Sequence, residues 1–287
     1  PIMAKAATYS VSGNREDLSD VLTILEPEAT PFVSMAKKAN ATGTFFEVQT
    51  QSLDQPSFDG VNEGEDVTSF SNKSADRVRL GNYIQKFRRS FQVSDIQELV
   101  DTAGVSSEFA HSEALAIREI KRDVESAVCS AQDRQADSGT GSPYKTRGMF
   151  KWLGVGGQPS DVPTAFQNVA NDTTPTQTET TFNEVLQELY EANGMPGGQL
   201  TLIAGPTLKK EISDFSRQAG GAGFAYQVTQ PAESKKITLS VNFYEGDFGN
   251  VAIIPSTLLN RTSGSATIDG DAGLLIDPDY VAIHTLK

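Results

Sequence analysis

Apolar residues recur at helical spacing over residues 106–134, which predicts one long helix. Steps of three and four residues place the apolar side chains on a single stripe: Ala110, Ala114, Ile117, Ile120, Val124, Val128 and Ala131. Ser106 or Ser107 can cap the start of this helix, and no glycine or proline interrupts it before Gly139. At 1.5 Å per residue it would extend about 40 Å. We therefore predict a spine to which the flanking segments attach.

The segment before this helix begins with short helical patterns. Residues 1–13 are small and polar and predict a flexible arm, and a short helix follows from Asn14 to about Leu25. A second short helix is predicted over Phe32–Ala39, because Pro31 would occupy the first helical position that proline favours. Helices this short need another surface to lie against.

Residues 44–93 predict a long two-stranded ribbon. Thr44–Leu53 and Asp76–Val93 favour extended backbone, and the polar residues between them predict a loop. An isolated ribbon of two strands is at best marginally stable in water, which favours a covering partner over a solvated hairpin. The ribbon has an acidic tip and a basic return strand. The resulting candidate contact residues are Glu63, Glu65, Asp66, Arg77, Arg79, Lys86, Arg88 and Arg89.

The part of the chain after the spine predicts a layer of mixed helices and strands. The loose, polar composition of Val155–Thr181 marks a subdomain boundary. Two helices are predicted next, Phe182–Ala192 and Thr207–Phe215, and Thr181 with Glu184 would form a capping box on the first. The predicted strands are Leu200–Ala204, Lys236–Glu245 and Asn250–Ser256, with a strand, turn and strand over residues 274–283.

Composition narrows the possible partners. The chain has 287 residues and a formal net charge of −13, so it should avoid nucleic acid and anionic membranes. Its one cysteine, Cys129, excludes an internal disulfide and is predicted to be a buried, inert thiol. No apolar run approaches the roughly 20 residues that a membrane span needs.

Motifs that carry catalytic chemistry are absent from the sequence. It contains no phosphate-binding loop, no nucleophile elbow and no Cys-X-X-Cys pair, and its two histidines, His111 and His284, lie far apart. The acidic tip favours solvation or pairing with arginine over weak binding of a divalent ion. We therefore expect no enzymatic activity, no cofactor and no metal.

Several short segments resemble, in their shared order, the major capsid proteins of tailed bacteriophages. They are Asn14–Asp20, Thr30–Phe32, Arg77–Tyr83, Glu119–Asp123, Gly205-Pro206, Phe243–Gly249, Ile254-Pro255 and Leu275–Tyr280. The resemblance implies the α+β fold of Hong Kong 97 type. Its parts would be an N-terminal arm (1–43), an extended loop (44–93), a peripheral domain with the spine helix (94–180), an axial domain (181–262) and return strands (263–287). The family would continue beyond the last strand, where this chain stops at Lys287.

The resemblance also implies a function and partners. The chain would assemble with itself into the hexamers and pentamers of an icosahedral head, formed in the cytoplasm of a bacterial host, that encloses double-stranded DNA without reading its sequence. Decoration and portal proteins would be further partners, and no membrane would be involved. Two alternatives stay open: the shell of an encapsulin-type nanocompartment, and an α+β hydrolase or binding protein in which the ribbon is a lid.

Overall fold

The computed structural model describes eleven parts of the chain: 29–54, 56–74, 77–100, 102, 104–167, 177–193, 199–218, 242–259, 261–263, 266–268 and 271–286. The predicted arm over 1–13 and the helix over 14–25 lie outside them. The chain divides into two compact units, and the described part of the first spans residues 88–120. The second unit contains residues 29–87 and 121–287.

A four-stranded sheet forms the centre of the second unit, with the strand order β5-β6-β4-β9. β4 (Gln199–Ala204) runs parallel to β6 (Gly249–Pro255) and antiparallel to β9 (Gly273–Ile276). β5 (Phe243–Gly246) pairs with β6 across a two-residue turn, so the predicted hairpin is confirmed. Of the predicted strand over 236–245, residues 236–241 lie outside the described part.

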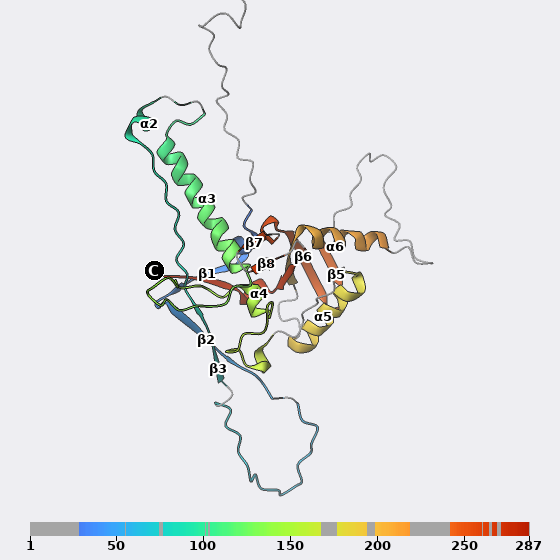
Figure 1. Ribbon diagram of the computed structural model, residues 1–287. Coiled ribbons are helices and arrows are strands. Elements are labelled where there is room, and N and C mark those ends of the chain that lie inside the picture. Colours follow the sequence, from blue (N-terminus) through green and yellow to red (C-terminus); the bar gives the residue numbers. More distant parts are fainter. Residues whose placement is uncertain are drawn as a thin grey trace, which may run out of the picture. The chain divides into compact units, whose positions relative to one another are not determined.

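Both faces of this sheet are covered, which explains the nearly continuous burial of β4. On one face, α5 (Glu179–Asn193) and α6 (Pro206–Gln218) contribute Leu186 and Ile212 to a core with Leu202 (Figure 1). On the other face, Ile203 and Leu274 belong to a second core that includes Phe32 and Cys129. The predicted burial of Cys129 is confirmed, and burial raises the pKa of its thiol.

The capping box predicted on α5 is wrong. The helix begins at Glu179, upstream of Thr181, and the backbone N–H of Thr181 donates to Oγ1 of Thr178 at 3.3 Å. Thr178 therefore supplies the side-chain acceptor at the helix start, which is the role the sequence had suggested for Thr181.

The ribbon is present, but its paired part is short. β2 (Phe45–Gln51) and β3 (Arg77–Tyr83) are antiparallel, with Val48 opposite Leu80. A long loop joins them beyond Gln51, and its described residues include no helix or strand (Figure 1). Beyond Tyr83 the backbone leaves the ladder, with one further bond from the Ile84 N–H to the Thr44 carbonyl at 2.9 Å.

The predicted helix over Phe32–Ala39 is confirmed in its first half and wrong in its second. α1 (Pro31–Met35) is one short helix, and β1 (Lys37–Ala41) follows it directly. β1 pairs in parallel with β10 (Ala282–Leu286), the last strand of the chain, and this distant partner overrides the local helical pattern.

A buried carboxylate holds α1 in place. Glu125 is 0% exposed. Its Oε1 accepts the N–H of Phe32 at 2.9 Å, and its Oε2 accepts the N–H of Val33 at 2.7 Å. The two donors are among those that a helix start leaves without partners. Burial raises the pKa of Glu125, while these hydrogen bonds act in the opposite direction.

The spine helix is shorter than predicted and its stripe is only partly covered. α3 extends over Glu108–Val128, and Ser107 caps it through the N–H of Ala110, as expected. Ile117 is 50% exposed, whereas Glu125 is the buried residue of the helix. The helix ends early because the Ser130 hydroxyl donates to the Ala127 carbonyl and accepts the Gln132 N–H, a local pattern that competes with helix.

The remaining elements are short. α2 (Asp95–Leu99) belongs to the first unit, where Oε2 of Glu98 accepts the N–H of Phe109 at 3.0 Å. The others are α4 (Met149–Trp152), η1 (Thr164–Phe166), η2 (Thr257–Leu259), η3 (Pro278–Tyr280) and the hairpin of β7 (Arg261–Ser263) and β8 (Ala266–Ile268). No helix in the described ranges has both the length and the apolar character needed to cross a bilayer.

Candidate assembly site

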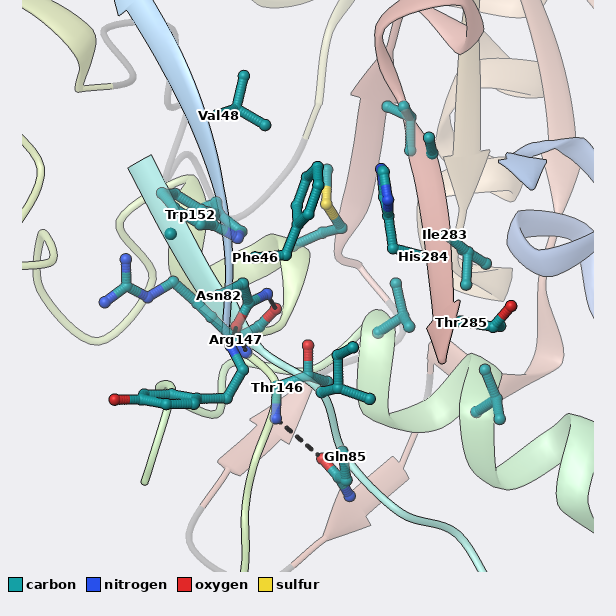
Figure 2. A pocket seen from close by; sticks show the side chains of 18 of the residues that line it. Phe46, Val48, Asn82, Gln85, Thr146, Arg147, Trp152, Ile283, His284 and Thr285 are labelled. Atoms are coloured by element: carbon teal, nitrogen blue, oxygen red, sulfur yellow. Dashed lines mark hydrogen bonds between the residues drawn. The ribbon is translucent and has the colours of Figure 1, made fainter. Parts of the chain in front are cut away.

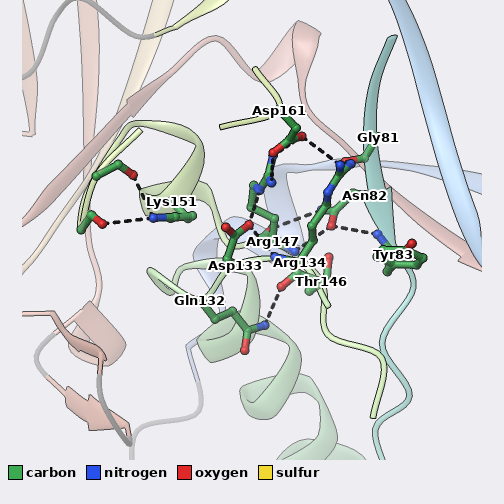
Figure 3. A network of polar contacts seen from close by, with 12 residues as sticks. Gly81, Asn82, Tyr83, Gln132, Asp133, Arg134, Thr146, Arg147, Lys151 and Asp161 are labelled. Atoms are coloured by element: carbon green, nitrogen blue, oxygen red, sulfur yellow. Dashed lines mark hydrogen bonds and ion pairs between the residues drawn. The ribbon is translucent and has the colours of Figure 1, made fainter. Parts of the chain in front are cut away.

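A buried arginine organises the chain around the root of the ribbon, which is the end of the β2–β3 ladder where Phe45 pairs with Tyr83. The side chain of Arg147 is 1% exposed, and its Nε donates to Oδ1 of Asp133 at 2.7 Å. Its Nη1 and Nη2 donate to the two carboxylate oxygens of Asp161 at 3.1 and 2.5 Å (Figure 3). The guanidinium also lies 4.5 Å from the centre of the Trp152 ring. Three donors of one side chain in these contacts fix three loop segments together.

The same network binds strand β3. Arg134 donates from Nη1 to the carbonyl of Gly81 at 2.7 Å, and its Nη2 lies 3.1 Å from Oδ2 of Asp161. Asn82 forms a reciprocal pair with the backbone of Arg147, at 2.7 Å through its oxygen and 3.2 Å through its nitrogen. The root of the ribbon is therefore attached to the segments that follow α3.

Electrostatic interactions favour the charged forms of both Arg147 and Asp161. Burial lowers the pKa of Arg147, but the hydrogen bonds to Asp161 and Asp133 outweigh burial and raise it overall. The pKa of Asp161 is lowered, mainly by its hydrogen bond from Arg147 and against its own partial burial. Both groups therefore stay ionised at neutral pH.

Gly81 is required where the ribbon meets this network. A Cβ at this position would lie 2.3 Å from Cζ of Phe45, so the Gly81→Ala variant must displace the Phe45 ring. We expect a loss of about 1–3 kcal/mol in the free energy of unfolding, measured by urea denaturation. Gly60→Ala is the matched control, because no atom lies within 4 Å of a Cβ there. Equal effects of the two variants would contradict the tight packing at Gly81.

A pocket of about 820 Å³ opens beside the root of the ribbon. Its walls come from β2, β3 and β10, from α4 and from the end of α3 (Figure 2). Phe46, Val48 and Ile283 contribute apolar surface, and the ring of His284 stacks on Phe46 at 3.9 Å. The charged side chains in its lining are Lys86 and Arg147, and no carboxylate lines it among the described residues.

The loop at the far end of the ribbon exposes large apolar side chains. Phe58 is 99% exposed and Phe70 is 88% exposed, and Leu53, Val61 and Val67 are exposed as well. We call residues 56–70 of this loop the tip. Such a cluster is unusual for a surface that faces only water, and it points to an interaction surface. The sequence predicted a contact for the carboxylates of the tip but not for these apolar residues, which follow no period of a helix or strand.

The candidate residues predicted from the sequence belong to several different segments of the chain. The tip carboxylates Glu63, Glu65 and Asp66 are exposed, and Oε2 of Glu65 accepts the N–H of Asn62 at 3.3 Å. The cations lie elsewhere. Arg77 and Arg79 are on β3, Lys86 lines the pocket, and Arg88 and Arg89 belong to the first unit.

Two of these cations form ion pairs within the chain. Arg79 lies 3.8 Å from Glu47 on the neighbouring strand, and Arg89 lies 3.7 Å from Glu119. Both pairs are exposed and therefore weak. No three His, Cys, Asp or Glu side chains converge as a metal site would require, as far as the described ranges extend.

One curated protein and one solved structure are similar to parts of this chain. A curated major capsid protein of Escherichia phage Phieco32 is 32% identical over 130 residues, which cover 44% of this chain and 36% of that protein. The alignment thus spans little more than a third of the relative. A capsid structure of the cyanophage P-SCSP1u aligns with 91% of this chain and 76% of its own, at 13% identity and a TM-score of 0.46.

A protein-family model matches nearly all of the chain. The model of the SU10 major capsid protein family matches residues 5–287, which include the ribbon, the Arg147 network and the four-stranded sheet. The resemblance to phage major capsid proteins is thereby confirmed. The chain belongs to the SU10 major capsid protein family.

Proposed function

We propose that this chain is the repeating subunit of an icosahedral phage head, in which hexamers and pentamers of the chain close around double-stranded DNA. One observation carries the proposal beyond family membership. The tip of the ribbon presents Phe58 and Phe70 to solvent, while the root of the same ribbon is fixed by a buried arginine. A firmly attached element with an apolar, uncovered end is suited to contact between subunits.

The mixed α and β composition is compatible with the Hong Kong 97-type arrangement, which belongs to the same proposal. Residues 1–43 would be the arm, 44–93 the extended loop and 94–180 the peripheral domain. Residues 181–262 would be the axial domain, whose centre is the four-stranded sheet, and 263–287 would return to the peripheral domain. Decoration and portal proteins are further partners in this proposal, and assembly takes place in the host cytoplasm.

The net charge of the chain supports a function in which the chain encloses DNA without binding to it. At −13 the chain repels a phosphate backbone, so a wall built from it would let packed DNA slide and leave. Such a wall would make no sequence-specific contact with DNA.

Electron microscopy of the purified full-length chain tests the proposal. We expect closed shells with five- and six-fold capsomers, and a particle mass in the megadalton range by light scattering. A stable monomer in dilute solution would refute a shell of any kind. Shells that copurify with an enzyme as cargo, in place of DNA-packaging proteins, would identify a nanocompartment.

Charge contacts between subunits form a separate prediction. Exposed ion pairs that involve Arg88 and Arg89 would weaken as salt is raised. We therefore expect the Arg88→Glu/Arg89→Glu variant to lower the yield of shells at low ionic strength, as measured by sedimentation. The Lys37→Glu variant, which reverses a cation paired with Asp279 at 2.8 Å, is the matched control. Unchanged yield and shell stability in the Arg88/Arg89 variant would count against a contact role for these arginines.

A further inference from the structure

We infer that Asp59 and Gly60 form a site of spontaneous covalent modification, at which the aspartate converts into an isoaspartyl linkage of the main chain. The inference goes beyond the proposed shell function and does not rest on it, because the reaction takes place on the unassembled chain. It needs no enzyme and no cofactor. It follows from the residue types at the tip, from the space around them and from their hydrogen bonds.

The reaction exchanges one amide bond for another. The backbone nitrogen of Gly60 attacks Cγ of Asp59 and the Cγ–Oδ2 bond breaks, so that the oxygen leaves as water with the amide proton and the proton of the carboxyl group. Water then adds to the main-chain carbonyl carbon of Asp59 in the resulting five-membered succinimide, and the bond from that carbon to the Gly60 nitrogen breaks. The main chain now runs through the former side chain. Because the water that was lost returns, the composition of the chain is unchanged and no oxidant or reductant takes part.

Gly60 supplies an unhindered attacking nitrogen. It has no Cβ to shield this nitrogen, and its backbone adopts angles that other residues avoid. A Cβ built at Gly60 would have no heavy atom within 4 Å, and the residue is exposed in the loop that joins β2 to β3 (Figure 1). Among the described residues, no group accepts the N–H of Gly60 in a hydrogen bond. The nitrogen is therefore neither shielded nor held in another contact.

Ser57 prepares the carboxyl group that is attacked. Its hydroxyl donates to Oδ2 of Asp59 at 3.2 Å, and its Oγ accepts the backbone N–H of Asp59 at 3.1 Å. The first bond polarises the carboxyl group and assists the departure of Oδ2, as a general acid does. The second bond keeps the hydroxyl beside the reacting residue. Ser57 therefore assists the step in which the succinimide forms.

The residues that follow other aspartates protect them from this reaction. Asp66 is exposed in the same tip, but the β-branched side chain of Val67 crowds the nitrogen that would attack. Asp277 precedes Pro278, which has no N–H to lose. Asp59 is the aspartate of the described ranges that precedes a glycine. The reaction should therefore be specific to Asp59 within this part of the chain.

Incubation in heavy-oxygen water tests the assignment. The purified full-length chain is aged at neutral pH and digested, and its peptides are analysed by mass spectrometry. Each passage through the succinimide adds one heavy oxygen atom, and electron-transfer fragmentation distinguishes isoaspartate from aspartate. We expect isoaspartate to form at Asp59 about tenfold faster than at Asp66. Equal rates at these two positions would overturn the inference.

Peptide mapping also separates Asp59 from two other pairs of related chemistry. These are Asn193-Gly194 and Asp269-Gly270, whose glycines lie outside the described residues. Only the peptide that contains Asp59 decides the inference.

Two substitutions test the roles of the reacting atoms. Gly60→Ala should slow the reaction about tenfold, because the added Cβ restricts the approach of the nitrogen to Cγ. The fold should not change, since the Cβ meets no neighbour, and circular dichroism checks this. Asp59→Glu should abolish the reaction, because its longer side chain cannot close the five-membered ring. A Gly60→Ala chain that isomerises at the rate of the parent would overturn the inference.

Ser57 is tested by a matched pair of variants. Ser57→Ala should slow the reaction about threefold, as expected for the loss of one weak hydrogen bond. Ser57→Thr keeps the hydroxyl and should isomerise at the rate of the parent. In urea the difference between Ser57→Ala and the parent should vanish, because the hydrogen bonds of the tip are lost. An unchanged rate in the folded Ser57→Ala chain would overturn the role of this hydroxyl.

The outcomes also separate the modification from the proposed function. A chain that forms shells but gains no isoaspartate at Asp59 would overturn the modification alone. A chain that isomerises at Asp59 but forms no shells would support the modification and overturn the shell function.

Discussion

Replacing Arg147 with methionine is expected to lower the free energy of unfolding by about 2–4 kcal/mol. Methionine fills much of the same buried volume but removes the hydrogen bonds to Asp133 and Asp161 and the contact with Trp152. The loss stays below that of a fully buried pair, because Asp133 is 48% exposed and can be solvated. Urea denaturation followed by tryptophan fluorescence measures the effect, since Trp152 is the one tryptophan.

The control for the Arg147→Met variant is a substitution in another ion pair of an arginine in the same unit. Arg79→Met removes a pair with Glu47 in which both side chains are well exposed, so we expect a loss of at most about 1 kcal/mol. Similar losses for the two variants would contradict an organising role for Arg147. The combined variant Arg147→Met/Asp161→Asn should recover part of the loss, because it removes the carboxylate that is left without its partner.

The pH dependence of unfolding gives an independent measure of this network. The pKa of Asp161 is lowered in the folded chain, so its contribution is present above the unfolded pKa and is lost as pH falls through the folded value. The parent should therefore lose this stability below about pH 4. Arg147→Met should lose less over the same range, because the charge that lowers the pKa is gone.

Replacing Glu125 with alanine is expected to cost about 3–5 kcal/mol and to detach α1. The substitution leaves the N–H groups of Phe32 and Val33 without an acceptor and opens a cavity beside a second-core residue, Cys129. Glu125→Gln keeps the volume and one acceptor, so we expect a smaller loss of about 1–3 kcal/mol. Hydrogen exchange at the amides of Phe32 and Val33 reports the detachment directly.

Glu113 provides the control for Glu125, because it is an exposed glutamate on the same helix. Glu113→Ala should change the free energy of unfolding by no more than about 0.5 kcal/mol. Slow exchange at both amides in Glu125→Ala would contradict the role of this carboxylate.

The pH effect of Glu125 has the opposite sign to that of Asp161. Its pKa is raised by burial, so the folded chain holds the proton more tightly than the unfolded chain above about pH 4.5. The free energy of unfolding therefore falls as pH rises from 4.5 through the folded pKa, and levels off above it. Glu125→Gln should abolish this decline.

Local patterns in the sequence predicted most of the elements but not their distant partners. The spacing of apolar residues identified α3, α5, α6 and the strands of the central sheet, because each buries a face that recurs with a fixed period. The proline signal at Pro31 led to a helix that wrongly included residues 37–39. Their structure is decided by pairing with β10, which no local pattern reveals.

The residues of the candidate site were harder to predict. Arg147 has no motif around it, since its partners come from segments on either side along the chain. Glu125 lies off the apolar stripe predicted for the spine, and the period of a helix does not reveal which short element will cover such a residue. At the tip, the charges of Glu63, Glu65 and Asp66 predicted contact residues. Phe58 and Phe70 were predicted only as part of a loop, although the structure exposes both.

The parallel pairing of β1 with β10 has a consequence for the order of events during synthesis. β10 is translated long after β1, so the ladder between them forms only once residues 282–286 have emerged from the ribosome. β10 also lines the pocket, which is therefore incomplete until residues 282–286 have emerged. We therefore expect the pocket to become complete late in synthesis, once β10 can pair with β1.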